Sequence, residues 1–430
     1  MDKTYASIFN STNDSSRHAV DLGTHSNTLD DNRVTDFDRW LTRKLLAAIG
    51  YPNICLQLWN GEGIFASSLP PVAIIFIKDR FSLCKLIFDP EYYFGELYSC
   101  GDVDVSGDLH ACLDAIYRSI KNSSDSLILK TFRKKSRHKN TVSHVRQNIH
   151  HHYDISNVFY QHWLDSEAMQ YTCAYFENPA MTLEQAQLAK MHHICRKLDL
   201  KPGQTIVEAG CGWGGFARFM AEQYGVKVKA YNISHKQICH AHEQIKKSAF
   251  ADEVEYIEDD YRNIEGRFDV FVSVGMLEHI GIDYYRELGR VIDNCLNDKG
   301  RGLIHSIGRN EPGLLNPWIE SRIFPGACPP SLGQMMQIFE PYSFSILDVE
   351  NLRLHYAKTL EHWINRFEKK SKLIQQMYDE EFVRAWFLYL TGSRAAFTSG
   401  TMQLFQVLFT RPQNNEVPWT RIHMYSKITR

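Results

Sequence analysis

An acidic residue just beyond a predicted buried strand is the first candidate for chemistry in this chain. The apolar run FDVFVSV (268–274) predicts the strand, and the segment SVGMLEHIG (273–281) places Glu278 and His279 directly after it. A carboxylate at this place could ligate a metal, act as a general base, supply charge at a helix N-terminus, or lie on the surface. The other motifs of the chain have to decide among these roles.

A glycine-rich segment, EAGCGWGGFARFM (208–220), follows a second predicted strand and opens a predicted helix. Gly210, Gly212 and Gly214 allow a tight turn and a close approach of the backbone to a ligand. A nicotinamide site would need an acid at the end of the next strand, where this sequence has Asn232, and the spacing is GxGxGG instead of GxGxxG. Both features favour S-adenosylmethionine, a cationic ligand that needs no pyrophosphate cradle.

The following strand-to-helix turn reads EDDYRN (258–263). Tyr261 and Arg262 could cover and contact an adenine ring there, but such residues also cap helices, so both readings stay open. The histidines of HHHYD (150–154) project in different directions, and no Cys/His spacing matches a zinc module. We therefore expect no metal site.

Length and composition indicate a globular protein with two domains. A chain of 430 residues is too long to fold around a single hydrophobic core. Its formal net charge of -2 gives no overall attraction to nucleic acid. Ten cysteines without a pairing pattern indicate reduced thiols. The N-terminus lacks the apolar segment of a signal peptide, and no stretch has the ~18 apolar residues of a membrane span. We expect a cytoplasmic protein whose membrane contact is peripheral.

The chain divides into four segments that differ in composition and in predicted secondary structure. Residues 1–35 are predicted to be a flexible polar leader. Residues 36–125 predict a small α+β domain, in which helical stretches flank the strand candidates ICLQLW, GIFAS, VAIIFIK and CKLIF. Residues 126–150 form a basic linker whose LKTFRKKSRHKN (129–140) is either a solvated connection or a site of attraction to anionic lipid headgroups.

The remaining residues, 151–430, alternate predicted strands with helices. The strand candidates are QTIVEAG, VKVKAYN, EVEYIE, FDVFVSV, GLIHSI, FSILDV and TMQLFQVLFTR. This alternation predicts an α/β fold with a parallel, doubly wound sheet that binds its ligands beyond the carboxyl ends of the strands.

Three segments, HYDISNVFYQHWLDSEAMQYTCAYF (152–176), VGMLEHIG and HSIGRNEPGLLNPWIESRIFPGACPP (305–330), together with VEAGCGWGG, closely resemble the cyclopropane-fatty-acyl-phospholipid synthases. The resemblance covers 150–430, and more weakly 40–120, which is similar to the small lipid-binding domain of bacterial members. It implies a Rossmann-like class I S-adenosylmethionine-dependent methyltransferase domain with a mostly parallel seven-stranded sheet. The implied reaction transfers a methylene group from S-adenosylmethionine to the cis double bond of unsaturated phospholipid acyl chains.

The resemblance also implies the site residues. The family's cofactor contacts fall on Tyr171, Thr172, Gly210, Gly212, Asn232, Gln237, Tyr261 and Arg262. The family's bicarbonate cage falls on Cys173, Glu278, His305, Ile307 and Tyr356. The implied partner is the surface of a phospholipid bilayer at the inner face of the membrane, and family members are often homodimers.

The implied chemistry needs a dry, aromatic pocket. The alkene attacks the sulfonium methyl group, and a base then deprotonates the resulting carbocation, which water would otherwise trap. Bicarbonate suits the base, and Glu278 either accepts its hydrogen bond or itself removes the proton. The candidate aromatic wall, which could stabilise the cation, comprises Tyr153, Phe159, Tyr160, Tyr171, Tyr175, Phe176, Trp318 and Phe324.

Other functions fit the same motifs. The cation could instead give a methyl-branched or methylene fatty acid. The same fold also occurs in amine N-methyltransferases, but residues 1–150 argue against a small soluble substrate. A lipid-binding protein without activity is a further alternative. Ser393 stands where some family members carry a cysteine, which indicates that the reaction needs no covalent thiol.

Overall fold

The computed structural model describes residues 33–122 and 155–425, and the chain divides into two compact units. The first unit comprises Met1–Phe132 and Glu368–Leu388, and the second comprises Arg133–Phe367 and Tyr389–Arg430. Most of the predicted leader, the basic segment 129–140 and Tyr153 lie outside the described residues. Each unit is described by itself.

The first unit is built on a four-stranded sheet of order β2-β1-β3-β4. Its strands are β1 (Cys55–Gln57), β2 (Gly63–Phe65), β3 (Ala73–Ile77) and β4 (Val103–Gly107). The helices around this sheet are α2 (Asp36–Ala48), which precedes the strands in the chain, α3 (Arg80–Phe88) and α4 (Pro90–Cys100) between β3 and β4, and α5 (Leu109–Asn122) after β4. A buried apolar cluster joins these elements through residues such as Leu45, Ile75 and Leu83.

One predicted strand of this unit is wrong. The run CKLIF lies inside helix α3, because the Asp79 side chain accepts a hydrogen bond from the Ser82 amide and caps the helix. An apolar run of this length fits a buried strand or a buried helix face equally well. The fourth strand is instead β4, which pairs with β3 in antiparallel register.

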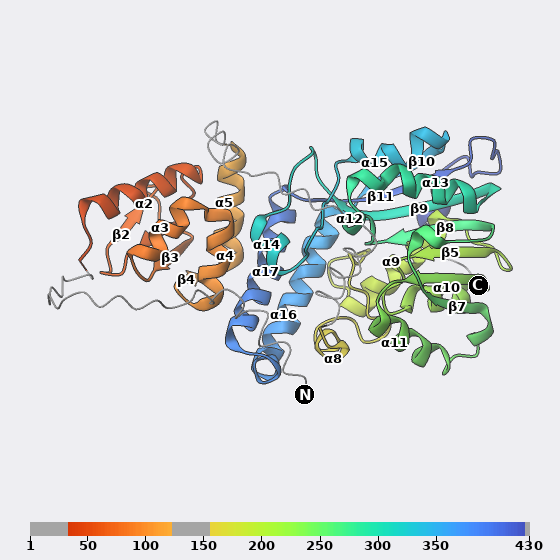
Figure 1. The fold of residues 1–430 in the computed structure, drawn as a ribbon, viewed down its shortest axis with the longest axis horizontal. Helices are drawn as coiled ribbons and strands as arrows, with labels where there is room; N and C mark the ends of the chain where they lie inside the picture. Colours follow the sequence, from red (N-terminus) through yellow and green to blue (C-terminus); the bar gives the residue numbers. More distant parts are fainter. Residues whose placement is uncertain (1–32, 123–154, 426–430) are drawn as a thin grey trace, which may run out of the picture. The chain divides into compact units, whose positions relative to one another are not determined.

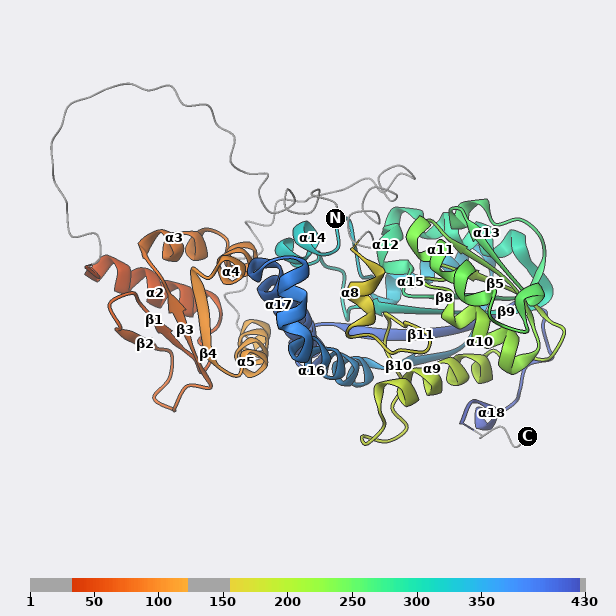
Figure 2. The same cartoon turned by 90° about the horizontal axis from the view of Figure 1, so that it is seen from below.

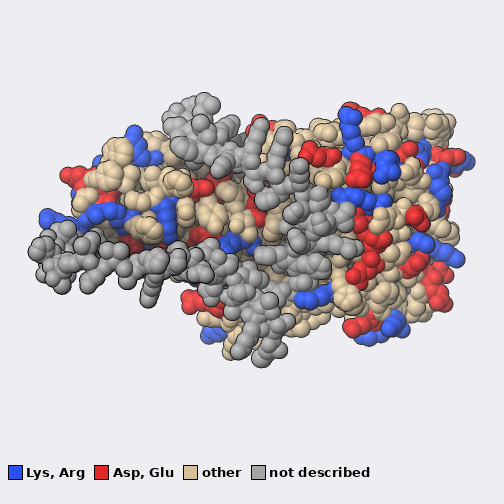
Figure 3. All heavy atoms as spheres, viewed as in Figure 1, with Lys and Arg blue, Asp and Glu red and all other residues tan. Residues whose placement is uncertain are grey.

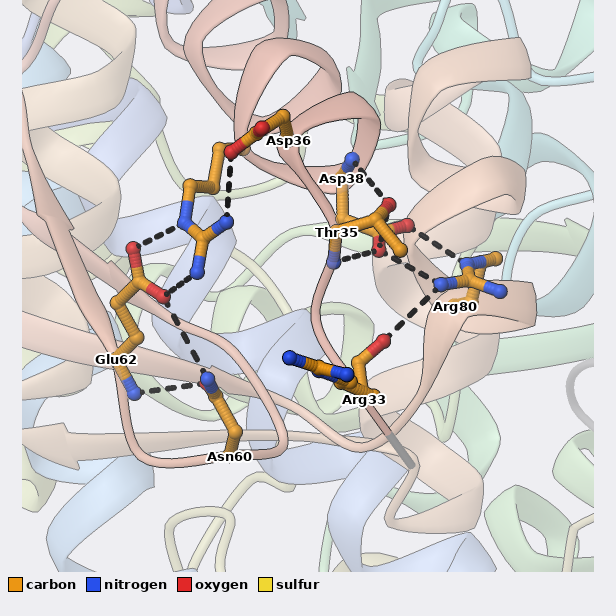
Figure 4. A network of polar contacts seen from close by, with 8 residues as sticks. Arg33, Thr35, Asp36, Asp38, Asn60, Glu62 and Arg80 are labelled. Carbon is orange, nitrogen blue, oxygen red and sulfur yellow. Dashed lines mark hydrogen bonds and ion pairs between the residues drawn. The ribbon is translucent and has the colours of Figure 1, made fainter. Parts of the chain in front are cut away.

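Polar contacts fix helix α2 within the first unit (Figure 4). Thr35 and Asp38 form a capping box at its start, and the buried Asp38 carboxylate accepts two bonds of 2.8 Å from Arg80 on α3. These hydrogen bonds, chiefly the one from Arg80, hold the pKa of Asp38 well below its usual range. On the other side of the helix, Arg39 binds both carboxylate oxygens of Glu62.

The second unit contains all seven predicted strands in one sheet of order β10-β11-β9-β8-β5-β6-β7 (Figure 1). The strands are β5 (Thr205–Ala209), β6 (Lys227–Asn232), β7 (Val254–Glu258), β8 (Phe268–Val274), β9 (Leu296–Gly308), β10 (Ser345–Asn351) and β11 (Gln403–Thr410). The strands from β9 to β7 are parallel, whereas β11 is antiparallel to both β9 and β10. The mostly parallel sheet predicted from the sequence is confirmed.

Helices cover both faces of this sheet, because successive residues of its strands point to opposite sides. Ile206 joins the apolar cluster under α9 (Leu183–Lys197), α10 (Gly215–Tyr224) and α11 (His235–Ile245). The next residue, Val207, joins the cluster under α12 (Leu277–Ile280), α13 (Tyr285–Cys295) and α15 (Leu332–Phe339). Figure 2 shows α9 and α10 on the side of the sheet away from α13.

The other helices are α8 (Asn157–Gln161), α14 (Pro317–Arg322), α16 (Arg353–Met377), α17 (Glu380–Thr398) and α18 (Ile422–Tyr425). In the part of the chain that the structure describes, no helix combines the length and apolar character needed to cross a membrane. On the face drawn in Figure 3, acidic and basic side chains are interspersed over the second unit.

The turn between β5 and α10 depends on glycine backbone conformations. Gly214 caps α10 with φ +76°, and a Cβ built there would lie 2.6 Å from the Tyr256 ring and 2.7 Å from Ala241 Cβ. Gly212 also has positive φ (+55°), but an added Cβ would have no atom within 4 Å. Gly214 therefore serves packing as well as backbone conformation, whereas Gly212 borders open space.

These two glycines give a matched pair of variants. Gly214→Ala adds a steric clash to backbone strain, and we expect it to lower the free energy of unfolding by about 3 kcal/mol. Gly212→Ala adds strain alone and should cost about 1 kcal/mol. Urea unfolding of both variants measures the difference, and equal losses would contradict the packing role of Gly214.

Candidate active site

The glycine turn, the end of β6 and the start of α11 are joined by hydrogen bonds. The amides of Gly210 and Cys211 both donate to the Tyr231 carbonyl oxygen, at 2.9 and 3.0 Å. The Asn232 side-chain amide donates to the Gly212 carbonyl oxygen (3.1 Å) and to Oε1 of Gln237 (2.8 Å). The structure thus brings together the predicted cofactor residues Gly210, Gly212, Asn232 and Gln237.

Tyr261 and Arg262 lie in a short 3-10 turn, η3 (Tyr261–Asn263), after β7. Arg262 binds Asp260 (3.2 Å) and Glu287 (3.1 Å), and its guanidinium lies 5.0 Å from the Tyr261 ring centroid. The Tyr261 hydroxyl and Nη2 of Arg262 are buried without a hydrogen-bond partner among the described residues. Burial raises the pKa of Tyr261, so its hydroxyl stays protonated and can donate.

Helix α9 holds the segment that carries Tyr171 and Thr172. The Gln187 side chain donates to the carbonyl oxygens of Gln170 and Thr172 (3.3 and 2.9 Å), and Lys190 donates to the Thr172 hydroxyl (3.0 Å). Lys190 also contacts Oε1 of Gln170. Burial lowers the pKa of Lys190 to about 8. These hydrogen bonds hold residues 170–172 in one conformation inside the second unit.

Tyr171 lies in a cluster of aromatic rings. Its ring centroid is 5.4 Å from those of Tyr160 and Trp363 and 5.3 Å from that of Trp163. Its hydroxyl lies 2.7 Å from the hydroxyl of Tyr389. Tyr160, Trp163 and Trp363 are fully buried, so this part of the unit is lined by aromatic rings.

The rest of the predicted aromatic wall is distributed more widely. Phe159 packs against Tyr160, and Phe324 lies 5.5 Å from Tyr389. Tyr175 instead stacks between His193 and His355, at 4.2 and 4.8 Å. Phe176 stacks on His362. Trp318 is buried on α14. Tyr175 and Phe176 therefore stack on histidine rings and are not part of the ring cluster around Tyr171.

His279 lies close to this aromatic region. Its ring lies 5.6 Å from the ring of Phe324, which in turn contacts Tyr389. Helix α12 is only four residues long, so the sequence contains no periodic pattern from which to orient His279.

Glu278 is a buried carboxyl group at the end of β8. Its Oε1 accepts a hydrogen bond of 2.7 Å from the Ile307 amide, and its Oε2 is buried without a partner among the described residues. Burial raises the pKa of Glu278 to about 7, against the opposing effect of hydrogen bonds from the backbone of Glu278 and Ile307 and from the Ser306 side chain. The Ile307 amide thus orients the Glu278 carboxyl group.

His305 lies on β9, two residues before Ile307, and its side chain is buried. The side-chain amide of Gln406 on β11 donates to its Nδ1 (3.1 Å), which leaves the ring proton on Nε2. Burial, followed by the positive charges of Lys190 and Lys197, lowers the pKa of His305 to about 3. His305 is therefore neutral, and its Nε2 is a buried donor without a partner among the described residues.

Cys173 and Tyr356 meet at the start of α16. The Cys173 thiol lies 3.9 Å from the Leu352 carbonyl oxygen, which also accepts a hydrogen bond from the Tyr356 amide. Tyr356 is buried against Phe397, with ring centroids 4.5 Å apart. Burial raises the pKa of the Cys173 thiol, so Cys173 is not a thiolate nucleophile.

Three of the four residues that follow β8 contact the other parts of the site. The Gly275 amide donates to the His305 carbonyl oxygen, and a Cβ built on Gly275 would lie 2.9 Å from Cγ2 of Thr172. A Cβ built on Gly210 would lie 2.9 Å from Cβ of Met276. Glu278 then binds Ile307. The turn 275–278 therefore joins the predicted cofactor residues to the predicted cage.

Sequence reasoning missed three residues of this region: Gln406, Lys190 and Tyr389. Gln406 is a polar residue inside the apolar strand segment LFQVLF, which is a signal that could have found it. The burial of Lys190 had no local signal, because lysines usually lie on the surface. Tyr389 stands in the apolar stretch AWFLYL, which is a signal of burial. Within 33–122 and 155–425, no group of three His, Cys, Asp or Glu side chains is placed to hold a metal ion.

Comparisons with known proteins agree with this geometry. Residues 140–407 match the family described as mycolic acid cyclopropane synthetase. A probable fatty acid methyltransferase from Pseudomonas putida is 34% identical over 389 residues, which cover 86% of this chain and 95% of that protein. The cyclopropane-fatty-acyl-phospholipid synthase of Escherichia coli K12 is 40% identical over 265 residues, covering 61% of this chain and 68% of that protein.

A solved structure shares the fold of the second unit. The mycolic acid cyclopropane synthase CmaA1, solved with SAH and CTAB, is 30% identical, with a TM-score of 0.59, and the match covers 62% of this chain and 98% of that one. The class I methyltransferase fold expected from the sequence is thereby confirmed. This chain belongs to the mycolic acid cyclopropane synthetase family and is an S-adenosylmethionine-dependent methyltransferase.

Proposed function

We propose that this enzyme is a cyclopropane-fatty-acyl-phospholipid synthase that transfers a methylene group to the cis double bond of unsaturated acyl chains. The observation that carries this proposal is Glu278, a buried carboxyl with one oxygen held by Ile307 and the other without a partner among the described residues. Ring closure requires removal of a proton from the added methyl group, and a buried carboxyl group beside that methyl group can hold or orient the base that removes it.

The residues around the glycine turn suit S-adenosylmethionine, which supplies an electrophilic methyl group when it is bound. Gly212 borders open space, and the buried Tyr261 hydroxyl is a donor without a partner among the described residues. Asn232 and Gln237 orient each other at the end of β6. Gln187 and Lys190 hold the Tyr171–Thr172 segment in one conformation. The chain's own contribution is a fixed position for the methyl donor.

A bicarbonate ion would supply the base, and three buried groups suit its oxygens. His305 is neutral with its proton on Nε2, so it can donate to an anion without competing for the proton. Glu278 has a pKa of about 7, so its protonated form can donate to the ion and its ionised form can accept from the ion's hydroxyl. The protonated form carries no charge and so does not repel the anion, whereas the ionised form offsets part of the repulsion through the hydrogen bond that it accepts. Tyr356 lies at the start of α16, where its ring packs against Phe397.

The aromatic cluster has two physical tasks in this reaction. Its buried rings, Tyr160, Trp163 and Trp363, exclude the water that would convert a carbocation to an alcohol. The face of each ring also attracts a passing cation, by about 0.5–2 kcal/mol. Because Cys173 is a buried thiol with a raised pKa, no covalent thiol step is included.

The first unit presents a face that suits the surface of a phospholipid bilayer, which would place the enzyme peripherally at the cytoplasmic side of the membrane. Phe37, Trp40 and Lys44 line one side of α2, and Phe81, Lys85 and Phe88 line one side of α3. All four aromatic rings are exposed, Phe88 by 78%. Lys44 lies 5.7 Å from the Trp40 ring and Lys85 lies 4.3 Å from the Phe81 ring. Aromatic rings beside lysines suit the headgroup region of anionic lipid.

A second candidate function keeps the methyl transfer and changes the fate of the cation to a methyl-branched or methylene acyl chain. The similarity to a probable fatty acid methyltransferase over 86% of this chain favours it. Both functions use the same fold and cofactor, so the product has to separate them.

Product analysis tests the reaction. We expect purified enzyme, incubated with methyl-labelled S-adenosylmethionine and vesicles of cis-unsaturated phospholipid, to give acyl chains that gain one methylene and contain a cyclopropane ring by mass spectrometry. Vesicles of saturated phospholipid are the control and should remain unlabelled. Methyl-branched or methylene products would establish the second candidate, and unlabelled lipid in all vesicles would contradict both.

The buried acid predicts how stability depends on pH. Because burial raises the pKa of Glu278 from 4.5 to about 7, the folded state retains a proton that the unfolded state loses, and stability falls as pH rises through this range. Glu278→Gln removes the titration. Its free energy of unfolding, relative to wild type, should therefore rise by about 2 kcal/mol between pH 5 and pH 8 in urea unfolding. A difference that is the same at both pH values would contradict a buried, protonated acid.

Three serine substitutions test the membrane face. Trp40→Ser, Phe81→Ser and Phe88→Ser together should weaken binding to phosphatidylglycerol vesicles by at least about tenfold in a sedimentation assay, because each ring loses apolar area buried in lipid. Phe65→Ser with Phe76→Ser is the matched control, since these exposed rings point to the opposite side of their strands from Ile64 and Ile75 in the core. Equal losses in both variants would contradict the assignment of this face.

A further inference from the structure

A cysteine, a histidine and a glutamate lie in series on the surface of the second unit, outside the residues used above. His235 and Cys239 are one turn apart on α11, and Glu258 is the last residue of β7. Nδ1 of His235 lies 2.7 Å from Oε2 of Glu258, and its Nε2 lies 3.4 Å from the Cys239 sulfur. All three side chains are exposed, His235 by 66% and Glu258 by 45%.

These contacts assign a role to each group. In the tautomer of the neutral His235 ring whose Nδ1–H donates to the Glu258 carboxylate, Nε2 carries a lone pair. That lone pair faces the Cys239 sulfur and can accept the thiol proton. A nucleophile within hydrogen-bond reach of a base, with the base oriented by a third group, is the arrangement that activates catalytic thiols.

The alternative of a metal site does not fit these residues, since no three His, Cys, Asp or Glu side chains in the described ranges are placed to hold an ion. A role in the methylation is also excluded by position, because Cys239 faces solvent while Gln237, two residues earlier, is buried and binds Asn232. The geometry that remains is that of a reactive surface thiol.

We propose that Cys239 is a covalent modification site for soft electrophiles and peroxides, activated by His235 and positioned by Glu258. With an alkyl halide, the thiol proton passes to His235 Nε2, the sulfur forms a bond to carbon, and the halide leaves. With a peroxide, the sulfur attacks one oxygen and the O–O bond breaks. The leaving hydroxide takes the proton from His235 to give water, so sulfur is oxidised to a sulfenic acid and the peroxide is reduced.

The same chain supplies a matched control thiol. Cys84 on α3 is exposed, like Cys239, and within the described residues no histidine is hydrogen-bonded to it. Cys100 is also exposed, but its thiol contacts the Leu97 carbonyl oxygen and burial raises its pKa. Comparison of Cys239 with Cys84 therefore separates activation by His235 from simple accessibility.

Alkylation rates test the proposal in the full-length, reduced protein. With a small excess of iodoacetamide at neutral pH, mass spectrometry of quenched peptides should show Cys239 reacting at least about tenfold faster than Cys84. His235→Asn should lower the Cys239 rate to that of Cys84, and Glu258→Ala should lower it partially. Neither change should alter the Cys84 rate. Equal rates for the two thiols in wild type, or a Cys239 rate that His235→Asn leaves unchanged, would overturn the proposal.

A second arm uses hydrogen peroxide with dimedone, which traps sulfenic acids. The dimedone adduct should accumulate on Cys239 before Cys84 in wild type and lose that preference in His235→Asn. An adduct that forms equally on both thiols, or only on Cys84, would contradict the peroxide chemistry. Because neither arm measures methylation, both are independent of the proposed reaction.

Discussion

The hydrogen bond from the Ile307 amide to the buried Glu278 carboxyl is the constraint around which the active site is arranged. It ties the short helix after β8 to the end of β9, and the Cys328 amide donates to the Glu278 carbonyl oxygen in the same turn. A carboxyl group removed from water loses most of its hydration, so it persists only where such donors replace the solvent. The turn 275–278 can then place Gly275 against Thr172 and Met276 against Gly210, which joins the methyl-donor side of the site to the base side.

Burial also sets the protonation states that the reaction needs. His305 is kept neutral, Lys190 has a pKa near 8, and Glu278 has a pKa near 7, so the interior holds groups that can exchange protons near neutral pH. Gln406 fixes which nitrogen of His305 carries the proton. The ring cluster around Tyr171 surrounds part of this region with surfaces that exclude water yet tolerate a cation. In the proposed reaction, polar groups would orient the base and aromatic groups would protect the intermediate.

The sequence predicted the sheet better than the side chains on it. All seven strands of the second unit were found, because each is an apolar run between helices and polar turns, and the glycine turn located the cofactor end of the sheet. The run CKLIF was assigned to a strand because its apolar residues fit either element, and only the Asp79 cap reveals the helix. The sequence could not show that Tyr175 stacks on His193 and His355 or that the Ile307 amide binds Glu278, since the groups that meet across these elements depend on tertiary packing. Lys190 and Gln406 act as hydrogen-bond donors to the site because they are buried in the folded protein.

The most direct test of this account is the protonation of Glu278 itself. Infrared difference spectra recorded over a pH titration should contain the carbonyl band of a buried carboxylic acid that disappears with a midpoint near 7, and Glu278→Gln should lack that band. The same band in Glu278→Gln, or no buried acid titrating near neutral pH in the wild type, would contradict the role of Glu278 as the group that holds the base.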